Sequence, residues 1–183
     1  LNGDLKKDEK DQTNLHSLEN IIKTPKKSII PRSKKQKDYL KALKTNPIVM
    51  SLGPAGTGKT FLYRKLLHHF RGDGKIAVAV AMSGLAALLL PRGRTAHSKF
   101  RLPVPLPETG ATANIKANSP LGELFRGMEL LIWDEAPASP KAAIDAVDRC
   151  LRDVIGIDAP FGGKRLFLVG TGDRHRLSYD AWM

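Results

Sequence analysis

"LGPAGTGKTFLYRKLL", Leu52–Leu67, is the stretch that decides the fold of this 183-residue chain. Its first half, Gly53–Thr60, matches the phosphate-binding pattern G-x-x-x-x-G-K-[ST] at every fixed position. Glycines in such a loop let the backbone approach phosphate closely and point consecutive N–H groups at it. We therefore predict a nucleotide site in which Lys59 reaches the β- and γ-phosphates and Thr60 binds Mg²⁺. The predicted nucleotide-binding residues are Gly53, Pro54, Ala55, Gly56, Thr57, Gly58, Lys59 and Thr60.

Apolar stretches of strand length alternate with helical patterns on both sides of this loop. The expected strands are residues 47–52, 75–82, 129–134 and 165–169, and the expected helices are residues 59–70, 84–90 and 140–155. The strands are apolar without alternation, which is typical of parallel strands buried on both faces. The sequence therefore predicts an α/β fold, with a parallel sheet that carries helices on both faces.

The formal net charge of +12 favours a polyanionic partner, either nucleic acid or a membrane surface. Residues 1–31 are rich in lysine, aspartate and asparagine, and we interpret them as a flexible basic arm before a P-loop domain at 32–183. No apolar run is long enough to span a bilayer. The single cysteine, Cys150, excludes an internal disulfide. We expect an intracellular protein, in the nucleus or mitochondrion of a eukaryote, or in the cytoplasm if bacterial or viral.

A second motif, "LLIWDEAP" at Leu130–Pro137, places two carboxylates directly after a buried strand. In a nucleotide hydrolase Asp134 would hold Mg²⁺ through water, and Glu135 would orient and deprotonate the attacking water. Together with Lys59 these two residues form the predicted catalytic set. Adjacent carboxylates at this point also occur as an ordinary helix start, which is the structural alternative.

Five stretches in the same order carry a family resemblance. They are "GPAGTGKTFLYRKLL", "AVAMSGLAALLLPRGRTAHSKF", "NIKANSPLGELFRGMELLIWDEAP", "AIDAVDRCLRDVIG" and "PFGGKRLFLVGTGD". From Gly53 to about Asp173 the chain resembles the first motor domain of the petite-integration-frequency (PIF-type) DNA helicases, especially their transposon-borne branch. The resemblance implies a RecA-like domain that uses ATP and Mg²⁺ for 5′-to-3′ unwinding, with single-stranded DNA as its track.

The resemblance also implies where nucleic acid binds. Ser83 and Gly84 follow a strand at the edge where parallel sheets bind ligands, and in the family this segment touches the DNA backbone. The stretch "GRTAHSKF" offers polar donors to phosphate and one aromatic ring that would stack on a base. These predicted contacts are Arg94, Thr95, His97, Ser98, Lys99 and, for stacking, Phe100.

Upstream of the loop the resemblance changes. The segment "SIIPRSKKQKDYLKALKTNPIVMSLGPAGTGKT" is similar to PhoH-like ATPases, and Gln36 matches a glutamine that reads the adenine edge in either family. The chain is then either a mosaic with its seam near Thr60 or a divergent helicase. Two alternative functions stay open: an RNA-associated PhoH-like ATPase that forms oligomers, and a non-catalytic nucleic-acid-binding remnant.

The sequence departs from the helicase pattern after its last predicted strand. In "GDRHRLSY", Gly172–Tyr179, Arg176 stands where the family has a glutamine that senses the γ-phosphate, and an arginine accepts no hydrogen bond. The chain ends at Met183, within or at the end of the first motor domain, so we expect the RecA-like domain to be incomplete there. We therefore expect slow ATP hydrolysis and no unwinding unless a second motor domain or self-association completes the site.

Overall fold

A computed structural model describes residues 22–23, 28–31, 34–54 and 58–171 of the chain. The chain forms two units, Leu1–Asn46 and Pro47–Met183. The sequence suggested a boundary between residues 31 and 32. Helix α2 (Lys34–Thr45) belongs to the first of these two units, and the predicted boundary stays a prediction.

The first unit contains a short antiparallel strand pair and helix α2. Strand β1 (Ile22–Lys23) pairs with β2 (Ser28–Ile29), so that Ile22 lies opposite Ile29. Both strands lie within residues 1–31, which the sequence predicted to be a flexible arm. The structure differs from that prediction at these four residues, which are paired. The physical reason is local, since β-branched isoleucines favour extended, paired backbone.

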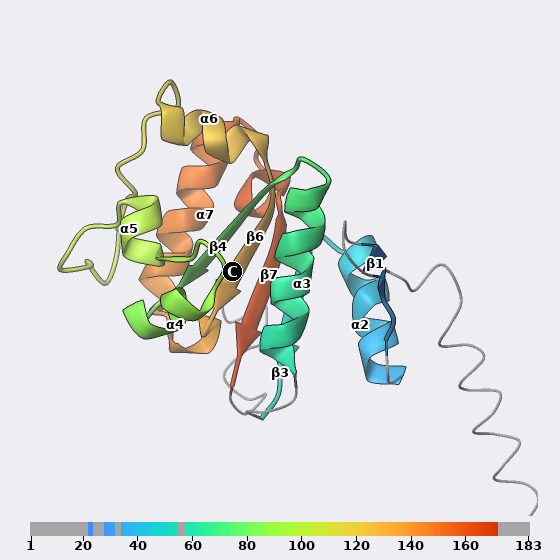
Figure 1. Ribbon diagram of the computed structural model, residues 1–183. Helices are drawn as coiled ribbons and strands as arrows, with labels where there is room; N and C mark the ends of the chain where they lie inside the picture. The colour runs from blue at the N-terminus through green and yellow to red at the C-terminus, as the bar shows by residue number, and fades with distance from the viewer. Residues whose placement is uncertain (1–21, 24–27, 32–33, 55–57, 172–183) are drawn as a thin grey trace, which may run out of the picture. The chain divides into compact units, whose positions relative to one another are not determined.

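The second unit is built on a five-stranded parallel sheet with the strand order β3-β7-β6-β4-β5 (Figure 1). Its strands are β3 (Ile48–Leu52), β4 (Ile76–Ala81), β5 (Arg94–Thr95), β6 (Met128–Asp134) and β7 (Arg165–Gly170). Phe167 of β7 pairs with Val49 on one side and Ile132 on the other. The four predicted strands are therefore present and parallel, whereas the short edge strand β5 was not expected.

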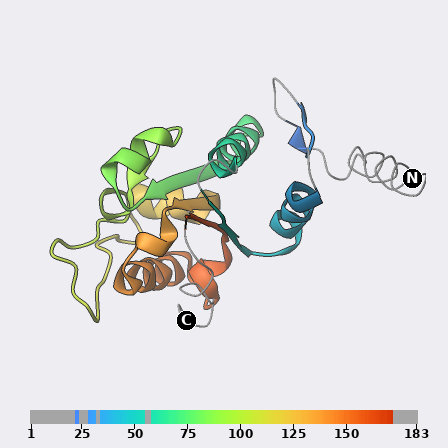
Figure 2. The same cartoon turned by 90° about the horizontal axis from the view of Figure 1, so that it is seen from below.

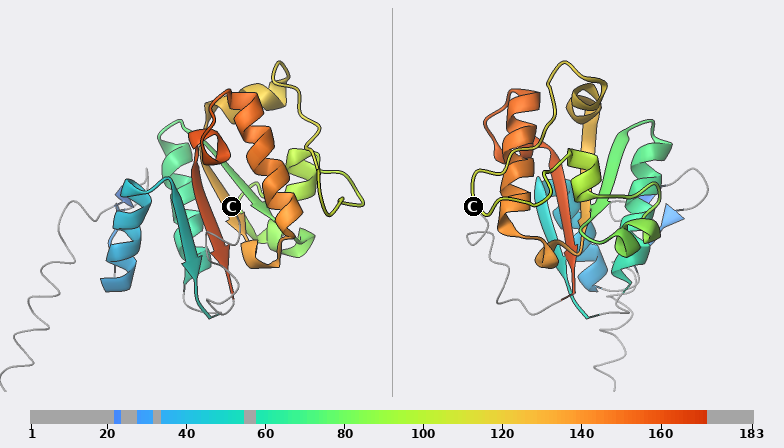
Figure 3. Two further views of the ribbon diagram at one scale, coloured as in Figure 1. Left: turned by 180° about the vertical axis from the view of Figure 1, so that it is seen from behind. Right: turned by 90° about the vertical axis from the view of Figure 1, so that its left-hand side faces the viewer.

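Helices cover both faces of this sheet, as the sequence predicted. They are α3 (Lys59–Gly72), α4 (Gly84–Leu89), α5 (Ala96–Phe100), α6 (Pro120–Gly127) and α7 (Lys141–Ile155), with 3₁₀ turns η2 (Ala136–Ala138) and η3 (Pro160–Gly163). The sheet lies between α3 on one face and α7 on the other (Figure 2 and the right view of Figure 3). None of the helices in the described ranges is long and apolar enough to cross a bilayer.

Sequence reasoning assigned no helix to the regions of α5 and α6. The Thr95 hydroxyl caps α5 by accepting a hydrogen bond from the Ser98 N–H at 3.2 Å. Ser119 caps α6 in the same way, toward the Gly122 N–H at 3.1 Å, and Pro120 follows it at the first helical position. A hydroxyl cap followed by proline is a signal of a helix start, so α6 was predictable.

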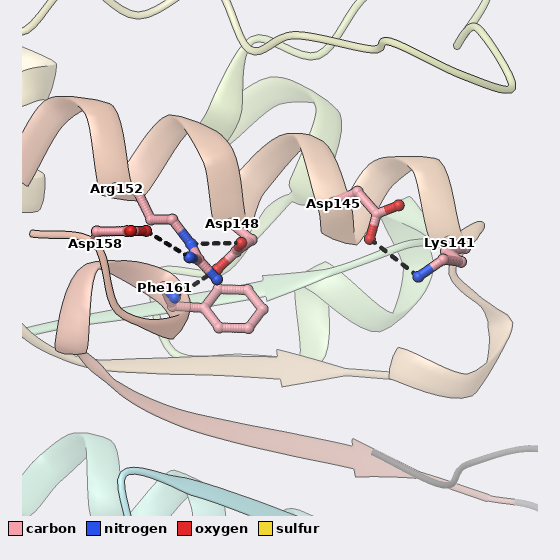
Figure 4. Close-up of polar contacts among 6 residues, drawn as sticks. All are labelled: Lys141, Asp145, Asp148, Arg152, Asp158 and Phe161. Carbon is pink, nitrogen blue, oxygen red and sulfur yellow. Dashed lines mark hydrogen bonds and ion pairs between the residues drawn. The ribbon is translucent and has the colours of Figure 1, made fainter. Parts of the chain in front are cut away.

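Charged contacts fix α7 to the turn that leads into β7 (Figure 4). The Asp148 carboxylate accepts hydrogen bonds from the Phe161 backbone N–H at 2.6 Å and from Arg152 Nε at 2.8 Å. Arg152 Nη1 also donates to Asp158, at 2.8 Å. Because Asp148 and Arg152 lie on one face of α7, a single helical turn holds η3 and thereby the start of β7.

An aromatic cluster forms the centre of the core. Phe100, Phe125 and Trp133 are fully buried. The Phe100 ring stacks on Phe125 with centroids 4.9 Å apart, and the Trp133 ring lies nearly parallel to it at 6.2 Å. The Trp133 indole N–H donates to Ser139 Oγ at 3.0 Å, so its one polar group is paired. The cluster therefore fixes β6 at the residue that precedes Asp134.

Candidate nucleotide and nucleic-acid site

The predicted functional residues follow the carboxyl ends of neighbouring strands. The loop Gly53–Thr60 follows β3, Asp134 ends β6, and Ser83 follows β4. Because the strands are parallel, their carboxyl ends lie at one edge of the sheet, which is where such sheets bind ligands. The topology thus brings together three segments that are far apart in the sequence.

The described part of the phosphate loop has the geometry expected of an anion site. Gly58 precedes α3 with a left-handed φ of 82°, which a side chain would strain. Lys59 is half-buried, and its Nζ donates to the carbonyl oxygens of Gly53 and Pro54, the latter at 2.7 Å. The ammonium group is thereby held across the loop, at the start of a helix whose N–H groups favour anions. Ala55, Gly56 and Thr57 lie outside the described residues.

Tyr63 joins the two predicted Mg²⁺ ligands. Its hydroxyl lies 3.1 Å from Thr60 Oγ1 and 2.9 Å from Asp134 Oδ2. Burial raises the pKa of Tyr63 to about 12. The hydrogen bond with Thr60 opposes this shift, and the hydrogen bond and charge of Asp134 add to it. The phenol is therefore protonated at neutral pH and donates to the Asp134 carboxylate.

Sequence reasoning missed Tyr63, although a signal was present. The residue follows Thr60 by three positions on α3, so the two side chains share one helix face. Thr60 and Asp134 offer hydroxyl and carboxylate oxygens, the hard ligands that Mg²⁺ prefers. Because both contact one phenol oxygen, they lie close enough for one Mg²⁺ and its water shell, so the residues present fit the metal.

Glu135 sits at a strained point of the chain. Its backbone is left-handed, with φ 54° and ψ 34°, and its N–H donates to Asp134 Oδ1 at 3.0 Å. Its side chain accepts a hydrogen bond from the Ser83 hydroxyl at 3.1 Å. Strained backbone of this kind persists where the surrounding structure fixes it. Two neighbours therefore determine where the Glu135 carboxylate points.

Ser83 has a second partner. Its Oγ accepts a hydrogen bond from the Ala86 N–H at 3.1 Å and so caps α4. This residue was predicted to touch nucleic acid, and the structure adds a contact with the predicted catalytic carboxylate. Gly84, the first residue of α4, is exposed beside it.

The predicted nucleic-acid segment has mixed exposure. Arg94 and Ser98 are exposed, whereas Thr95, His97 and Lys99 are half-buried. Lys99 Nζ lies 5.9 Å from the centre of the Phe125 ring. These positions allow contact with phosphate from one side of α5 and β5.

The prediction that Phe100 stacks on a base is wrong. Its side chain is 0% exposed, because it stacks on Phe125 and Trp133 inside the core. A base cannot reach this ring without opening the second unit. Phe100 is therefore a structural residue that holds α5 against β6.

Two further predictions are not tested by these contacts. Gln36 is an exposed residue of α2 in the first unit, and its role toward adenine stays a prediction. Asp173 and Arg176 lie outside the described residues.

A family model also matches this chain directly. The model of the PIF1-like helicases matches residues 33–177. The chain belongs to the PIF1-like helicase family. The matched range includes α2, the segment whose sequence resembled PhoH-like ATPases. The fold is accordingly the RecA-like motor fold of PIF1-like helicases.

Known relatives agree with this family. The chain is 33% identical over 144 residues to an ATP-dependent DNA helicase Pif1 of Bdellovibrio bacteriovorus, covering 77% of this chain and 32% of that protein. It resembles the crystal structure of Bacteroides Pif1 bound to ssDNA, with 28% identity and a TM-score of 0.67, over 81% of this chain and 35% of that one. A Bacteroides Pif1 complex with ADP-AlF3 and ssDNA gives 26% identity and a TM-score of 0.65 over the same shares. The chain thus spans about a third of the length of these PIF1-like relatives.

Proposed function

We propose that this chain is an ATP-binding and ATP-hydrolysing motor domain that acts on single-stranded DNA. The observation that carries the proposal is the bridge made by Tyr63, which joins Thr60 of the phosphate loop to Asp134 of the second motif. An ordinary helix start would not link these two motifs. The similarity to Bacteroides Pif1 with ADP-AlF3 and ssDNA supports both ligands.

Each side chain has one task in this proposal. The Lys59 ammonium and the α3 N-terminus bind the phosphates. Thr60 and Asp134 would hold Mg²⁺, which neutralises the charge that develops on the transferred phosphoryl group. Glu135 accepts the proton of the attacking water while the water oxygen bonds to the γ-phosphorus. The bond from that phosphorus to the bridging oxygen breaks, and ADP and inorganic phosphate leave.

DNA unwinding requires more than ATP hydrolysis. We propose that 5′-to-3′ unwinding needs a second motor domain, or a second copy that completes the nucleotide site in trans, because two domains must close and open around ATP. The single-stranded DNA contact proposed for this chain comprises Ser83, Gly84, Arg94 and the exposed side of α5.

Steady-state ATP hydrolysis tests the proposal. Rates would be measured with Mg²⁺, alone and with single-stranded DNA or RNA, for the wild type, Lys59→Ala and Glu135→Gln. Lys65→Ala on the same helix and Glu108→Gln in the exposed loop before α6 are matched controls, since each removes one charge away from the site. We expect a DNA-stimulated rate that only the two site variants abolish.

Other outcomes separate the alternatives. Stimulation by RNA alone would favour the PhoH-like function. A rate that Lys59→Ala leaves unchanged would exclude hydrolysis at this loop. Nucleic-acid binding without turnover in any condition would favour the non-catalytic remnant.

A further inference from the structure

A basic pocket lies along the open edge of β4. Strand β5 pairs with β4 only at Val80 and Ala81, so within the described residues the first part of β4 has no strand beside it on that edge. A cavity of about 370 Å³ occupies this position. It is lined by four basic residues and by apolar ones: Arg71, Lys75, Arg92 and Lys99, with Gly74, Ile76–Ala79 and Leu124.

The four cations come from four different parts of the second unit. Arg71 belongs to α3, Lys75 precedes β4, Arg92 follows α4, and Lys99 lies on α5. In the part of the chain that the structure describes, no carboxylate lines the pocket. Four segments that are distant in sequence thus place positive charges in one partly enclosed pocket. Such a concentration of positive charge attracts anions.

Two of these cations are already engaged. Arg71 donates Nε and Nη2 to the Ala77 carbonyl and Nη1 to the Pro91 carbonyl, which uses three of its five N–H groups. Lys75 pairs with Glu129 at 3.1 Å on the exposed rim. Arg71 is therefore a fixed part of the pocket wall, with two N–H groups left for a ligand.

Arg92 and Lys99 carry the charge that is not balanced. Within the described ranges, neither has a carboxylate at ion-pair distance. Burial lowers the pKa of Lys99, and the charges of Arg94 and Arg71 lower it further. The pKa of Arg71 is lowered by burial and then by Arg92. The cations thus repel one another, and an anion between them would relieve that repulsion.

We propose that this basic pocket binds a backbone phosphate of single-stranded nucleic acid, at a site separate from the ATP site. The pocket lies along the first part of β4, whereas Ser83 and Glu135 follow the carboxyl ends of β4 and β6. Arginine and lysine are the donors that phosphate prefers. We choose nucleic acid as the ligand for two reasons. One is the proposed function, on which this inference rests, and the other is that the positive charge continues beyond the pocket. The positive charge continues from Lys99 to the exposed Arg94, and a polyanionic strand carries successive phosphates that could contact both.

The test removes the unbalanced charges without emptying the core. Arg92→Gln with Lys99→Met removes both charges and keeps most of the length of both side chains. Lys116→Gln with Arg165→Gln is the matched control, because it removes two charges from exposed positions outside the pocket. Binding of a fluorescent single-stranded oligonucleotide would be measured by anisotropy over a range of salt concentrations.

We expect the affinity of the pocket variant to fall roughly tenfold below that of the control. The slope of log affinity against log salt should shrink by about 0.7 for each phosphate that the variant no longer binds. Affinity for a fluorescent ATP analogue should be the same in both variants. Equal oligonucleotide affinity and equal salt slopes in the two variants would overturn the proposal.

A second measurement identifies the source of the phosphate. Backbone amide NMR shifts at Lys75–Ala79 would be followed during titration with the oligonucleotide, and separately with inorganic phosphate at equal phosphate concentration. Shifts with the oligonucleotide alone support the proposal. Equal shifts with inorganic phosphate overturn the assignment to nucleic acid, and no shift with either overturns the site. If the wild type binds no oligonucleotide, the proposed function fails, and the inorganic phosphate titration still decides whether the pocket is an anion site.

Discussion

Replacing Phe100 by alanine separates a core residue from a base-stacking residue. The Phe100 side chain is 0% exposed, and its ring stacks on Phe125 at 4.9 Å and lies 6.2 Å from Trp133. Removing a buried phenylalanine ring costs about 3–5 kcal/mol, because the transfer free energy of the ring adds to that of the cavity left behind. We therefore expect Phe100→Ala to lower the free energy of unfolding by that amount, a large part of the stability of a domain of this size.

The assay is urea unfolding followed by tryptophan fluorescence, beside two other variants. Phe61→Ala is the matched control, since Phe61 is 61% exposed and its loss should change stability by about 0.5 kcal/mol or less. Phe100→Leu keeps most of the buried volume, so it should fold and bind single-stranded DNA within about twofold of the wild type. Unchanged stability in Phe100→Ala, together with weak DNA binding by folded Phe100→Leu, would refute the burial of this ring.

Four further predictions concern Tyr63, Ser83 and Cys150. Tyr63→Phe removes the hydroxyl between Thr60 and Asp134. We expect the Mg²⁺ concentration needed to bind a fluorescent ATP analogue to rise by about 10-fold or more. An unchanged Mg²⁺ requirement would show that the phenol does not position the metal ligands. Because the pKa of Tyr63 is raised to about 12, its protonated form stabilises the fold fully below pH 10, and this contribution is lost between pH 10 and 12. Unfolding of Tyr63→Phe should therefore depend less on pH in that window, and equal slopes would contradict the prediction. Ser83→Ala should lower the rate of ATP hydrolysis and leave ATP affinity unchanged, because Glu135 loses a hydrogen-bond donor. The same variant should destabilise α4 by about 1 kcal/mol, because the helix loses its cap. Ser83→Thr should restore the rate, and failure to do so would leave Ser83 only a capping role. Burial, followed by the charge of Asp153, raises the pKa of the Cys150 thiol to about 11. This buried thiol should thus stay unreactive toward a disulfide reagent at pH 8 until urea unfolds the chain, and rapid labelling of folded protein would show that α7 opens.

The parallel sheet was predictable because its long strands are mostly apolar and do not alternate between apolar and polar residues. The third predicted strand, at 129–134, differs from β6 (Met128–Asp134) by one residue. The predicted helix at 59–70 stops two residues before the end of α3, whose last turn carries Arg71. Local sequence could not reveal that extension, because Arg71 is held there by carbonyl groups of β4 and of the segment after α4.

The sequence predicted which residues form the motifs of the site, but it predicted fewer of the contacts that those residues make. The phosphate loop and the Asp134–Glu135 pair follow from a fixed pattern, since their chemistry dictates their spacing from the flanking elements. Phe100 was misassigned because α5 has only five residues, too few for a helical period to show which side chains face the core. Its neighbours are polar, and only the positions of Phe125 and Trp133 explain why this ring turns inward.

The strand order explains why a tyrosine is needed at position 63. Strand β7 lies between β3, which leads into the phosphate loop, and β6, which ends in Asp134. Two strand spacings, roughly 10 Å, therefore separate the strands that carry the two motifs. Helix α3 starts at Lys59 and covers this gap on one face of the sheet (Figure 1), and the Tyr63 hydroxyl reaches Asp134 from it at 2.9 Å. A phenylalanine would fill the same volume without joining the motifs, so the hydroxyl couples the position of the loop to the position of Asp134.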